Sequence, residues 1–491
     1  MERYGRRDLV ARGGRLVGAG AALALGLSPE SRAAGRLDQL DRALRGPLLR
    51  PGQAGYGAAR RPWNARFDDV LPQAVAQPLD TADVQVIVRW AVAHDERLAV
   101  RSGGHSYAGL SSGTGLLVDL GRLASVGVLP GGRAAVGAGA TLGDVYGALW
   151  TAGGRTIPAG SCPTVGVAGL ALGGGHGFAA RAFGLACDSL RAVRIVTADG
   201  QAHDVSAASR PNLFWALRGG GAGSFGIVTR LTFATRKVGT VTTFALRWPW
   251  AAAADAIAAW QAFMATAPDA LSSVLALRVP ATTGGTPTVA VNGMFLGPKA
   301  AASSALQGLV AADPAPTAAS VVQRTFAGAT SYFAGGQAER RRIAGSSRVA
   351  RTPLGRKGRD AVVEAVDDRH ADPRLRGGGI VLFAFGGAVG RVGRAATAYV
   401  HRDARFSLEL LGLWTSPSGA VEAANLAWIR RTRLALAPYT SGEALQNYAD
   451  RGLVGWKRAY YAENLERLVA TKQAVDPTNR FRHAQSIPTS L

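Results

Sequence analysis

Glycine is concentrated in three short segments of this chain, and these segments constrain the fold more than any other feature of the sequence. They are 101–107 (RSGGHSY), 157–177 (IPAGSCPTVGVAGLALGGGHG) and 218–229 (RGGGAGSFGIVT). Because glycine has no side chain, it allows positive φ and lets the backbone approach a ligand closely. Successive N–H groups in such a turn can point at one anion. The segments therefore predict a flat ligand or a phosphate chain held against bare backbone.

The element that follows the third glycine segment argues against one common nucleotide-binding fold. In a Rossmann unit, the G-x-G-x-x-G turn follows a strand and opens a helix. Here the glycines run into the apolar stretch 225–232, which has the composition of a strand. The sequence therefore disfavours a nicotinamide dehydrogenase.

Length and charge set the broad class of the protein. A chain of 491 residues can bury two substantial cores, so we expect two domains or lobes. Lys and Arg number 56 against 33 Asp and Glu, which gives a formal net charge of +23. The arginines are scattered, and no nucleic-acid-binding module accompanies them. This pattern favours a solvated basic surface, and we expect no nucleic-acid partner.

The N-terminus has the features of a targeting segment. Arg6-Arg7 is followed by an apolar run over 16–27 and by small residues around Ala33. The run is too short to span a membrane, so we expect no membrane span. The arrangement resembles a twin-arginine export signal, and the alternative is an ordinary basic, disordered start. Residues 1–34 are assigned to this segment and excluded from the fold, and the protein is predicted to be secreted.

Hydrophobic spacing outlines the elements of the remaining chain. It predicts helices over 36–50, 84–92, 144–152, 251–267 and 299–312, and strands over 67–79, 98–101, 116–120, 192–197, 225–232, 242–247, 288–295, 379–385 and 406–414. Beyond residue 236 the glycine turns become sparse, and strands alternate with Ala-rich helices. This second half predicts an antiparallel sheet with helices on one face.

Two residues in the glycine segments carry chemistry that their neighbours lack. His105 follows Gly103-Gly104, and taken alone it would be a turn histidine exposed to water. Cys162 lies on a glycine loop, where a buried structural thiol is unusual; a disulfide to Cys187, the only other cysteine, is the alternative. His176 is expected to be a hydrogen-bonding turn residue. Because no Cys or His spacing matches a zinc site, we expect no metal.

Taken in order, the three glycine segments resemble the FAD-binding domain of the vanillyl-alcohol oxidase superfamily. The end of the chain, 460–468 (YYAENLERL) with 476–488 (DPTNRFRHAQSIP), resembles the C-terminus of its berberine-bridge-enzyme-like branch. The resemblance spans roughly 60–240 and 440–491. It implies an α+β fold: a two-lobed FAD-binding domain of the PCMH type, with an inserted substrate domain built on an antiparallel sheet flanked by helices. The implied boundaries are 35–238 for the FAD domain, 239–440 for the substrate domain and 441–491 for a C-terminal segment that completes the FAD domain.

The resemblance also implies how FAD is held. His105 matches the histidine bonded to the 8α-methyl group of the isoalloxazine, and Cys162 matches the cysteine bonded to its C6 atom, so the flavin is expected to be bicovalent. Covalent tethering suits an exported enzyme that cannot replace lost FAD. The same resemblance assigns further residues to the lining of the cofactor site: Arg101, Ser102, Gly103, Gly104, Ser106, Val165, Gly166, Gly169, Gly175, Ile227 and Asn464.

Two residues are candidates for the proton acceptor. The segment 446–450 (QNYAD) resembles an N-Y-x-D motif whose tyrosine removes the substrate hydroxyl proton, which assigns that role to Tyr448. A free phenol titrates near 10, so Tyr448 would need a lowered pKa at neutral pH. Glu409, where some relatives carry a catalytic carboxylate, is an alternative or a partner. A valine at position 165 is associated in this family with oxygen access, and this favours an oxidase.

These observations predict a secreted FAD-dependent oxidase. It would oxidise a hydroxyl-bearing small molecule, either a carbohydrate or a secondary metabolite, with molecular oxygen as acceptor and hydrogen peroxide as product. Three alternatives stay open: an amine or alkaloid oxidase on the same scaffold, a flavinylated binding protein without turnover, and a basic surface- or nucleic-acid-binding protein without flavin.

Overall fold

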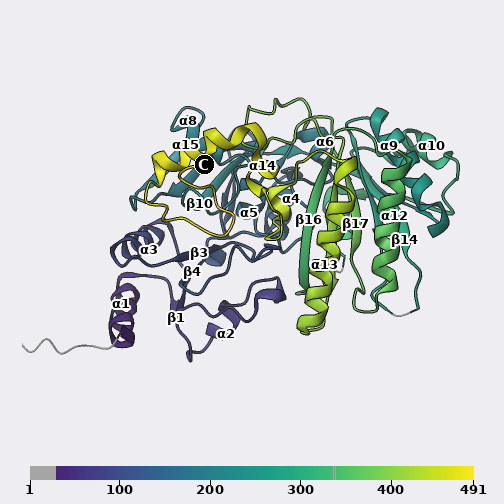
Figure 1. Ribbon diagram of the computed structural model, residues 1–491. Coiled ribbons are helices and arrows are strands. Elements are labelled where there is room, and N and C mark those ends of the chain that lie inside the picture. The colour runs from purple at the N-terminus through teal and green to yellow at the C-terminus, as the bar shows by residue number, and fades with distance from the viewer. Residues whose placement is uncertain (1–28, 283, 336, 338) are drawn as a thin grey trace, which may run out of the picture.

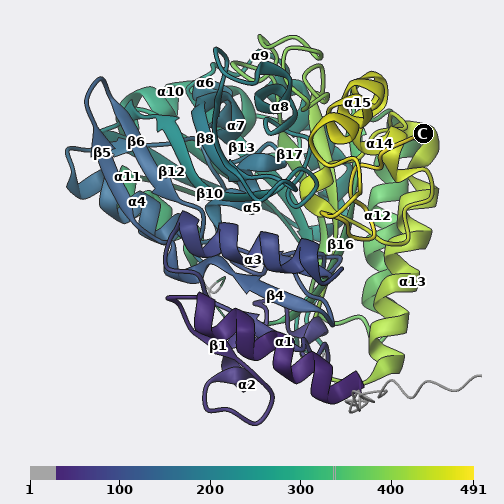
Figure 2. The same cartoon turned by 90° about the vertical axis from the view of Figure 1, so that its left-hand side faces the viewer.

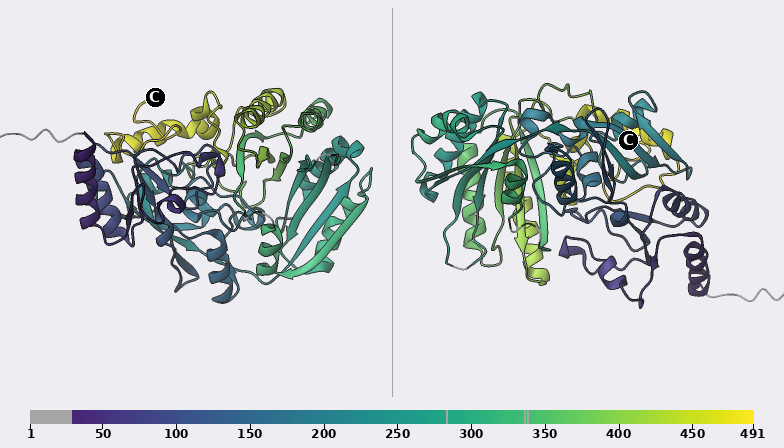
Figure 3. Two further views of the ribbon diagram at one scale, coloured as in Figure 1. Left: turned by 90° about the horizontal axis from the view of Figure 1, so that it is seen from below. Right: turned by 180° about the vertical axis from the view of Figure 1, so that it is seen from behind.

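The computed structural model describes residues 29–282, 284–335, 337 and 339–491, and the first 28 residues of the predicted export segment lie outside this part. Three main sheets are arranged along the molecule (Figure 1). The part before residue 235 forms one end, and the strands of the middle third form the other. The view from behind shows the same two ends (Figure 3).

The first sheet contains the strand that leads into the first glycine segment. Its order is β1-β2-β4-β3, in which β2, β4 and β3 are parallel and β1 is antiparallel. The strands are β1 (Leu48–Leu49), β2 (Ala74–Ala76), β3 (Leu98–Arg101) and β4 (Leu116–Asp119). Helices α1 (Pro29–Ala43) and α3 (Thr81–Ala93) lie beside it, and α2 (Tyr56–Ala59) follows β1 (Figure 2). Helix α3 forms where predicted because Val84, Ile87, Val88 and Ala91 recur at helical spacing and are buried.

The second sheet is antiparallel and positions the other two glycine segments. Its order is β5-β6-β10-β8-β9, with β5 (Val126–Leu129), β6 (Arg133–Gly137), β8 (Leu190–Val196), β9 (Ala202–Ser206) and β10 (Ile227–Ala234). Short strands β7 (Arg155–Thr156) and β11 (Arg236–Lys237) pair separately. The helices of this region are α4 (Leu142–Thr151), α5 (Val167–Leu172), α6 (Ala180–Phe183), α7 (Ala186–Ser189) and α8 (Pro211–Ala216).

The third sheet has seven antiparallel strands in the order β15-β12-β14-β13-β17-β18-β16. They are β12 (Thr240–Trp248), β13 (Leu271–Arg278), β14 (Thr288–Phe295), β15 (Ala318–Thr325), β16 (Arg342–Ala350), β17 (Gly379–Ala384) and β18 (Phe406–Trp414). Its helices are α9 (Ala253–Thr266), α10 (Lys299–Val310), α11 (Phe326–Ala334), α12 (Arg356–Ala371) and α13 (Gly419–Ala435).

Side-chain alternation gives this large sheet two different faces. On β13, Leu275 and Leu277 pack into the hydrophobic core that includes helix residues such as Trp260 and Trp428. Ala276 between them and Arg278 after them face the opposite way and line a cavity. The predicted antiparallel sheet with helices on one face is therefore confirmed, and its other face is turned toward the glycine segments.

The end of the chain returns to the first half of the molecule. Helix α15 (Leu465–Val475) lies above β10 in the view of Figure 1, and it packs against α8 and against α14 (Trp456–Tyr461). Lys472, fully buried on α15, donates hydrogen bonds to the Ser224 and Phe481 carbonyl oxygens, both at 2.7 Å. The α+β fold is confirmed. The boundaries predicted after residues 238 and 440 fall between elements and stay predictions.

Two predicted elements near the N-terminus are wrong in extent. The helix predicted over 36–50 is α1, which ends at Ala43 because Gly46 and Pro47 cannot continue it; a Cβ on Gly46 would lie 2.1 Å from the Gln77 carbonyl oxygen. The strand predicted over 67–79 is mostly irregular. Its first residue belongs to the 3₁₀ turn η1 (Ala65–Phe67), which is capped by the Asn64 side chain. Within the predicted range, only β2 pairs with other strands.

Candidate active site

A cavity of about 780 Å³ lies between the glycine segments and the seven-stranded sheet. This is the size of a site for a cofactor or a drug-sized ligand. One wall is backbone from 102–106, 165–169 and 221–223, and the other carries side chains of β13, β14, β17 and β18. The 3₁₀ turn η5 (Gln446–Tyr448) adds to the wall from the end of the chain.

Most of the residues predicted for the site line this cavity. They are Ser102, Gly103, Gly104, His105, Ser106, Cys162, Val165, Gly166, Gly169, Gly175, Glu409 and Tyr448. Arg101, Ile227 and Asn464 are not on its wall. Arg101 is buried and pairs with Asp119 at 3.0 Å, whereas Ile227 is fully buried within β10.

His105 is held rigidly at the cavity wall. Its ring stacks on Trp63 with centroids 3.9 Å apart, and its Nε2 atom lies 2.9 Å from Thr164 Oγ1. Burial lowers the pKa of His105 to about 3, although the hydrogen bond with Thr164 opposes this shift. The imidazole is therefore neutral and retains a lone pair at neutral pH.

Cys162 reaches the same threonine from the second glycine segment. Its Sγ atom lies 3.5 Å from Thr164 Oγ1 and 3.4 Å from the Gln337 carbonyl oxygen. The thiol and the imidazole therefore share one neighbour, although 56 residues separate them in the chain. Cys187 is a free thiol, buried beside Asp188 and Arg402, so the alternative of a Cys162–Cys187 disulfide is wrong.

A cluster of polar side chains faces these two residues from the sheet. Tyr107 donates its hydroxyl to Glu409 Oε1 at 2.7 Å, and its ring stacks on Tyr448 with centroids 5.7 Å apart. Gly345 on β16 makes room for Tyr107, because a Cβ there would lie 2.6 Å from the tyrosine ring. Asn447 donates to the Leu170 carbonyl oxygen at 3.1 Å, which fixes the turn that carries Tyr448.

Tyr448 lacks the lowered pKa that it would need to act as a base at neutral pH. Burial, and then the Glu409 carboxylate and Tyr399, raise the pKa of Tyr448 well above 10, so its phenol is protonated at neutral pH. Burial also raises the pKa of Glu409, while the Tyr107 hydrogen bond and the Arg278 charge oppose this rise. A carboxyl group with a raised pKa is better matched to accept a proton near neutral pH than this phenol is.

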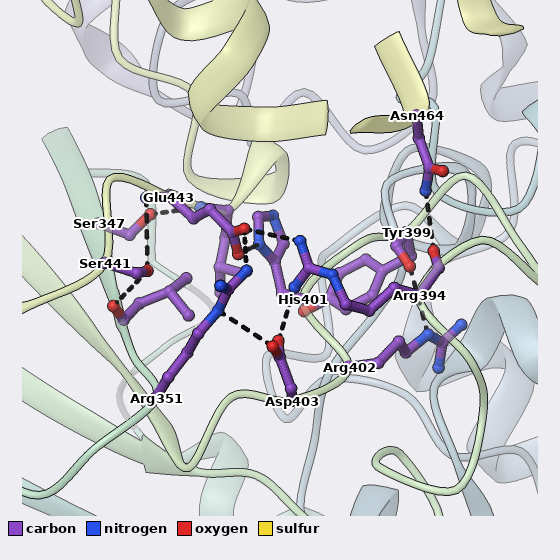
Figure 4. Close-up of polar contacts among 12 residues, drawn as sticks. Ser347, Arg351, Arg394, Tyr399, His401, Arg402, Asp403, Ser441, Glu443 and Asn464 are labelled. Atoms are coloured by element: carbon purple, nitrogen blue, oxygen red, sulfur yellow. Dashed lines mark hydrogen bonds and ion pairs between the residues drawn. The ribbon is translucent and has the colours of Figure 1, made fainter. Parts of the chain in front are cut away.

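Asn464 supports the cavity wall from behind. Its Nδ2 atom donates to the carbonyl oxygens of Arg394 and Thr397 at 2.8 and 3.2 Å (Figure 4). The loop held in this way carries Tyr399, whose ring lies where a Cβ on Gly174 would be 2.5 Å away. On the same loop, His401 Nδ1 lies 2.9 Å from Glu443 Oε2, and Arg394 donates to Glu443 Oε1 at 2.8 Å. These hydrogen bonds overcome burial and lower the pKa of Glu443 to about 2.

Several residues on the cavity wall received no role in the sequence analysis. Tyr107 is the last residue of the first glycine segment, so its position alone was a usable signal. Arg278 and Tyr399 gave none, because the strand and the loop that carry them show no motif. Within the described residues, no cluster of three or more His, Cys, Asp or Glu side chains is placed to hold a metal ion. None of the described helices has the length and apolar character needed to cross a membrane.

Known proteins match this chain over nearly its whole length. A family model described as an FAD binding domain matches residues 72–206, and one described as berberine and berberine like matches 444–488. The FAD-linked oxidoreductase YgaK of Bacillus subtilis is 33% identical over 454 residues, which cover 91% of this chain and 97% of the relative. The chain belongs to the berberine bridge enzyme-like family of FAD-linked oxidases. A xylooligosaccharide oxidase of Thermothelomyces thermophilus, also similar to this berberine bridge enzyme-like protein, is 29% identical over 96% of this chain and 98% of its own.

Solved structures support the same assignment. BBE-like 1 of Physcomitrella patens superposes on this berberine bridge enzyme-like protein with a TM-score of 0.84 at 30% identity, covering 93% of this chain and 99% of the other. The protein is therefore an FAD-dependent oxidase, and the resemblance stated from the motifs is confirmed.

The cavity fits the cofactor that the family implies. Three buried polar atoms on its wall have no hydrogen-bond partner within the described chain: Ser111 Oγ, Tyr399 Oη and Gln446 Oε1. Buried polar atoms are normally paired, so this wall is suited to a ligand with several polar groups. A Cβ on Gly169 would meet no atom within 4 Å, so the bare backbone there is open to the cavity.

Proposed function

We propose that the protein is an exported oxidase that binds FAD covalently through both His105 and Cys162, and that oxidises a hydroxyl-bearing small molecule with molecular oxygen. The observation that carries the proposal is the convergence of the two side chains on Thr164 at the cavity wall, at 2.9 and 3.5 Å. Two potential nucleophiles from separate glycine segments would hold one ring from two positions.

The state of His105 supports its role as an attachment residue. Attack on a ring substituent needs a neutral imidazole, and the pKa of about 3 provides one at neutral pH. Thr164 occupies Nε2, so Nδ1 is the nitrogen left to form the bond. Each link would replace one hydrogen of FAD, on the 8α-methyl group for His105 and on C6 for Cys162, and one hydrogen of the side chain. The two electrons and two protons released would pass to oxygen and give hydrogen peroxide.

The substrate proton would be taken up by the cluster on the sheet wall. Glu409 is the only carboxylate among the lining residues of the described chain, and the Tyr107 hydrogen bond fixes its orientation. Within the described chain the Tyr448 hydroxyl makes no hydrogen bond, so it can orient the substrate hydroxyl beside Glu409. FAD, when bound, accepts a hydride from the substrate carbon and passes two electrons to oxygen.

The residue at position 165 supports oxygen as the electron acceptor. Val165 lines the cavity three residues after Cys162, and a leucine there would fill more of the space beside the ring. If Val165→Leu leaves the rate of flavin reoxidation by oxygen unchanged in a stopped-flow experiment, this residue does not control oxygen access.

The relatives favour a carbohydrate as substrate over an amine or an alkaloid. The name of the xylooligosaccharide oxidase describes a sugar substrate. Export by residues 1–34 would place the enzyme where such sugars occur. Fusion of this segment to a reporter that is active only after folded export tests whether the segment directs export.

Two measurements test the proposal as a whole. Flavin should remain with the wild-type polypeptide after denaturation in acid, His105→Ala or Cys162→Ala should each retain one link, and the double variant should release its flavin. A peroxide-release screen over sugars, alcohols and amines should give turnover with hydroxyl compounds. Release of all flavin from the wild type would refute the covalent part, and a flavinylated protein that no compound reduces would support a binding protein.

A further inference from the structure

Arg278 is a charged residue on the cavity wall whose chemistry the proposed reaction leaves unused. It is the last residue of β13 and points to the cavity side of the sheet, as do Ala276 and Val274 before it. Within the described chain, its guanidinium makes no hydrogen bond or ion pair. Burial lowers the pKa of Arg278, while Glu409 and Tyr107 oppose this shift. The Arg278 guanidinium is therefore partly desolvated and has few contacts.

An arginine in such a place normally has an anionic partner. A buried guanidinium without one is costly, because its five N–H groups lose water and gain nothing in return. Glu409 does not fill the role, because no nitrogen of Arg278 lies within 4.0 Å of a carboxylate oxygen and Tyr107 already donates to Glu409. Planar, bidentate binding of a carboxylate is the interaction for which arginine is best suited.

The other charged groups on the wall are engaged elsewhere. Arg341 pairs with Glu339 at 3.1 Å, and Arg482 donates to the Asn479 carbonyl oxygen at 3.1 Å, beside the third glycine segment. Burial lowers the pKa values of His105 and His176 to about 3 and about 4, so both rings are neutral. Arg278 is therefore the cation that remains available to a ligand on the sheet side of the cavity.

The surroundings of Arg278 leave room for a polar ligand. Its cross-strand partner on β17 is Gly379, which has no side chain, and its partner on β14 is Thr288. Thr288 and Asn292 line the same wall. Glu409 on β18 pairs with Val381 on β17, and Val381 pairs with Ala276 on β13. Glu409 and Arg278 therefore lie two strands and two residues apart, about 12 Å between their backbones, so one ligand can reach both.

We propose that Arg278 binds a carboxylate of the substrate, so that the preferred substrates are acidic hydroxy compounds, with uronic-acid sugars as the favoured class. This proposal rests on the proposed function and adds the charge of the substrate to it. The carboxylate would lie against Arg278 while the hydroxyl to be oxidised lies beside Glu409 and Tyr448.

Matched pairs of probes that differ only in the acid group test the proposal. Suitable pairs are digalacturonate with galactobiose, glucuronate with glucose, and mandelate with benzyl alcohol. Binding to the flavinylated enzyme is measured by calorimetry, and turnover by peroxide release. The wild type should bind or turn over at least one acid ten times better than its neutral counterpart. Arg278→Gln should remove that preference, so that the acid is bound and turned over no better than its neutral counterpart.

Arg247→Gln is the matched control, because Arg247 is an exposed arginine of the same sheet. It should behave as the wild type. If no acid exceeds its neutral partner in the wild type, or if Arg278→Gln binds acids as well as the wild type does, the proposal is wrong. Calorimetry keeps this outcome separate from the proposed oxidase activity. Failure of every probe to reduce the flavin, with acid binding intact, would count against the activity and not against Arg278.

Discussion

At the scale of single residues, the main question is which group accepts the substrate proton. Glu409→Gln should lower kcat by about 10²–10⁴-fold, because it removes the carboxylate that faces the reacting hydroxyl. Tyr448→Phe should lower kcat less than Glu409→Gln does, because the phenol is protonated and serves to orient the substrate. Burial raises the pKa of Glu409 above its ordinary 4.5, so the wild-type kcat/KM should fall as the pH drops through that raised pKa.

A pH profile separates the two candidates. The acidic limb should disappear in Glu409→Gln and persist in Tyr448→Phe. Glu364→Gln, an exposed glutamate of α12, is the control for loss of one negative charge, and flavin content verifies folding. A Glu409→Gln enzyme with normal turnover, together with an inactive Tyr448→Phe enzyme, would return the role of base to the tyrosine.

Individual residues also mark where sequence reasoning reaches its limit. The sequence could place His105 and Cys162 in one site because each lies in a glycine motif, and these motifs occur in the order found in the family. Arg101 and Asn464 matched motifs equally well, yet both pair behind the wall with Asp119 or with backbone carbonyls. A motif identifies a residue but does not tell which way its side chain points.

At the scale of elements, the C-terminal helix α15 holds the third glycine segment in place through a buried ion pair. Lys472 and Asp476 are both fully buried one turn apart, and Lys472 also donates to the Ser224 carbonyl oxygen. Lys472→Met should lower the free energy of unfolding by about 3 kcal/mol, because it leaves the Asp476 charge buried with backbone donors only. Thermal unfolding measures this against Lys237→Met, an exposed control, and equal melting temperatures would contradict it.

The strands show which elements local sequence can specify. The strands β12, β14, β17 and β18 were predicted within a few residues, because their apolar runs are long. The strands β13, β15 and β16 were missed: Ser272 and Ser273 interrupt β13, β15 is mostly exposed, and β16 contains Gly345, Ser346 and Ser347. Pairing with neighbouring strands, which no local pattern encodes, determines all three.

At the scale of the whole molecule, the positive charge should act on an acidic substrate before it enters the cavity. The formal net charge of +23 gives a long-range field that attracts anions, and salt screens it with a Debye length of about 10 Å at 0.1 M. For an acidic substrate, kcat/KM should therefore fall several-fold between 10 mM and 0.5 M salt, whereas the value for its neutral counterpart should stay constant. Arg278→Gln should keep much of this salt dependence, because the field comes from the whole surface and the direct contact from one residue. Steady-state assays over that range of ionic strength provide the measurement. A salt effect of equal size on both members of the pair would show that the surface charge does not steer the substrate.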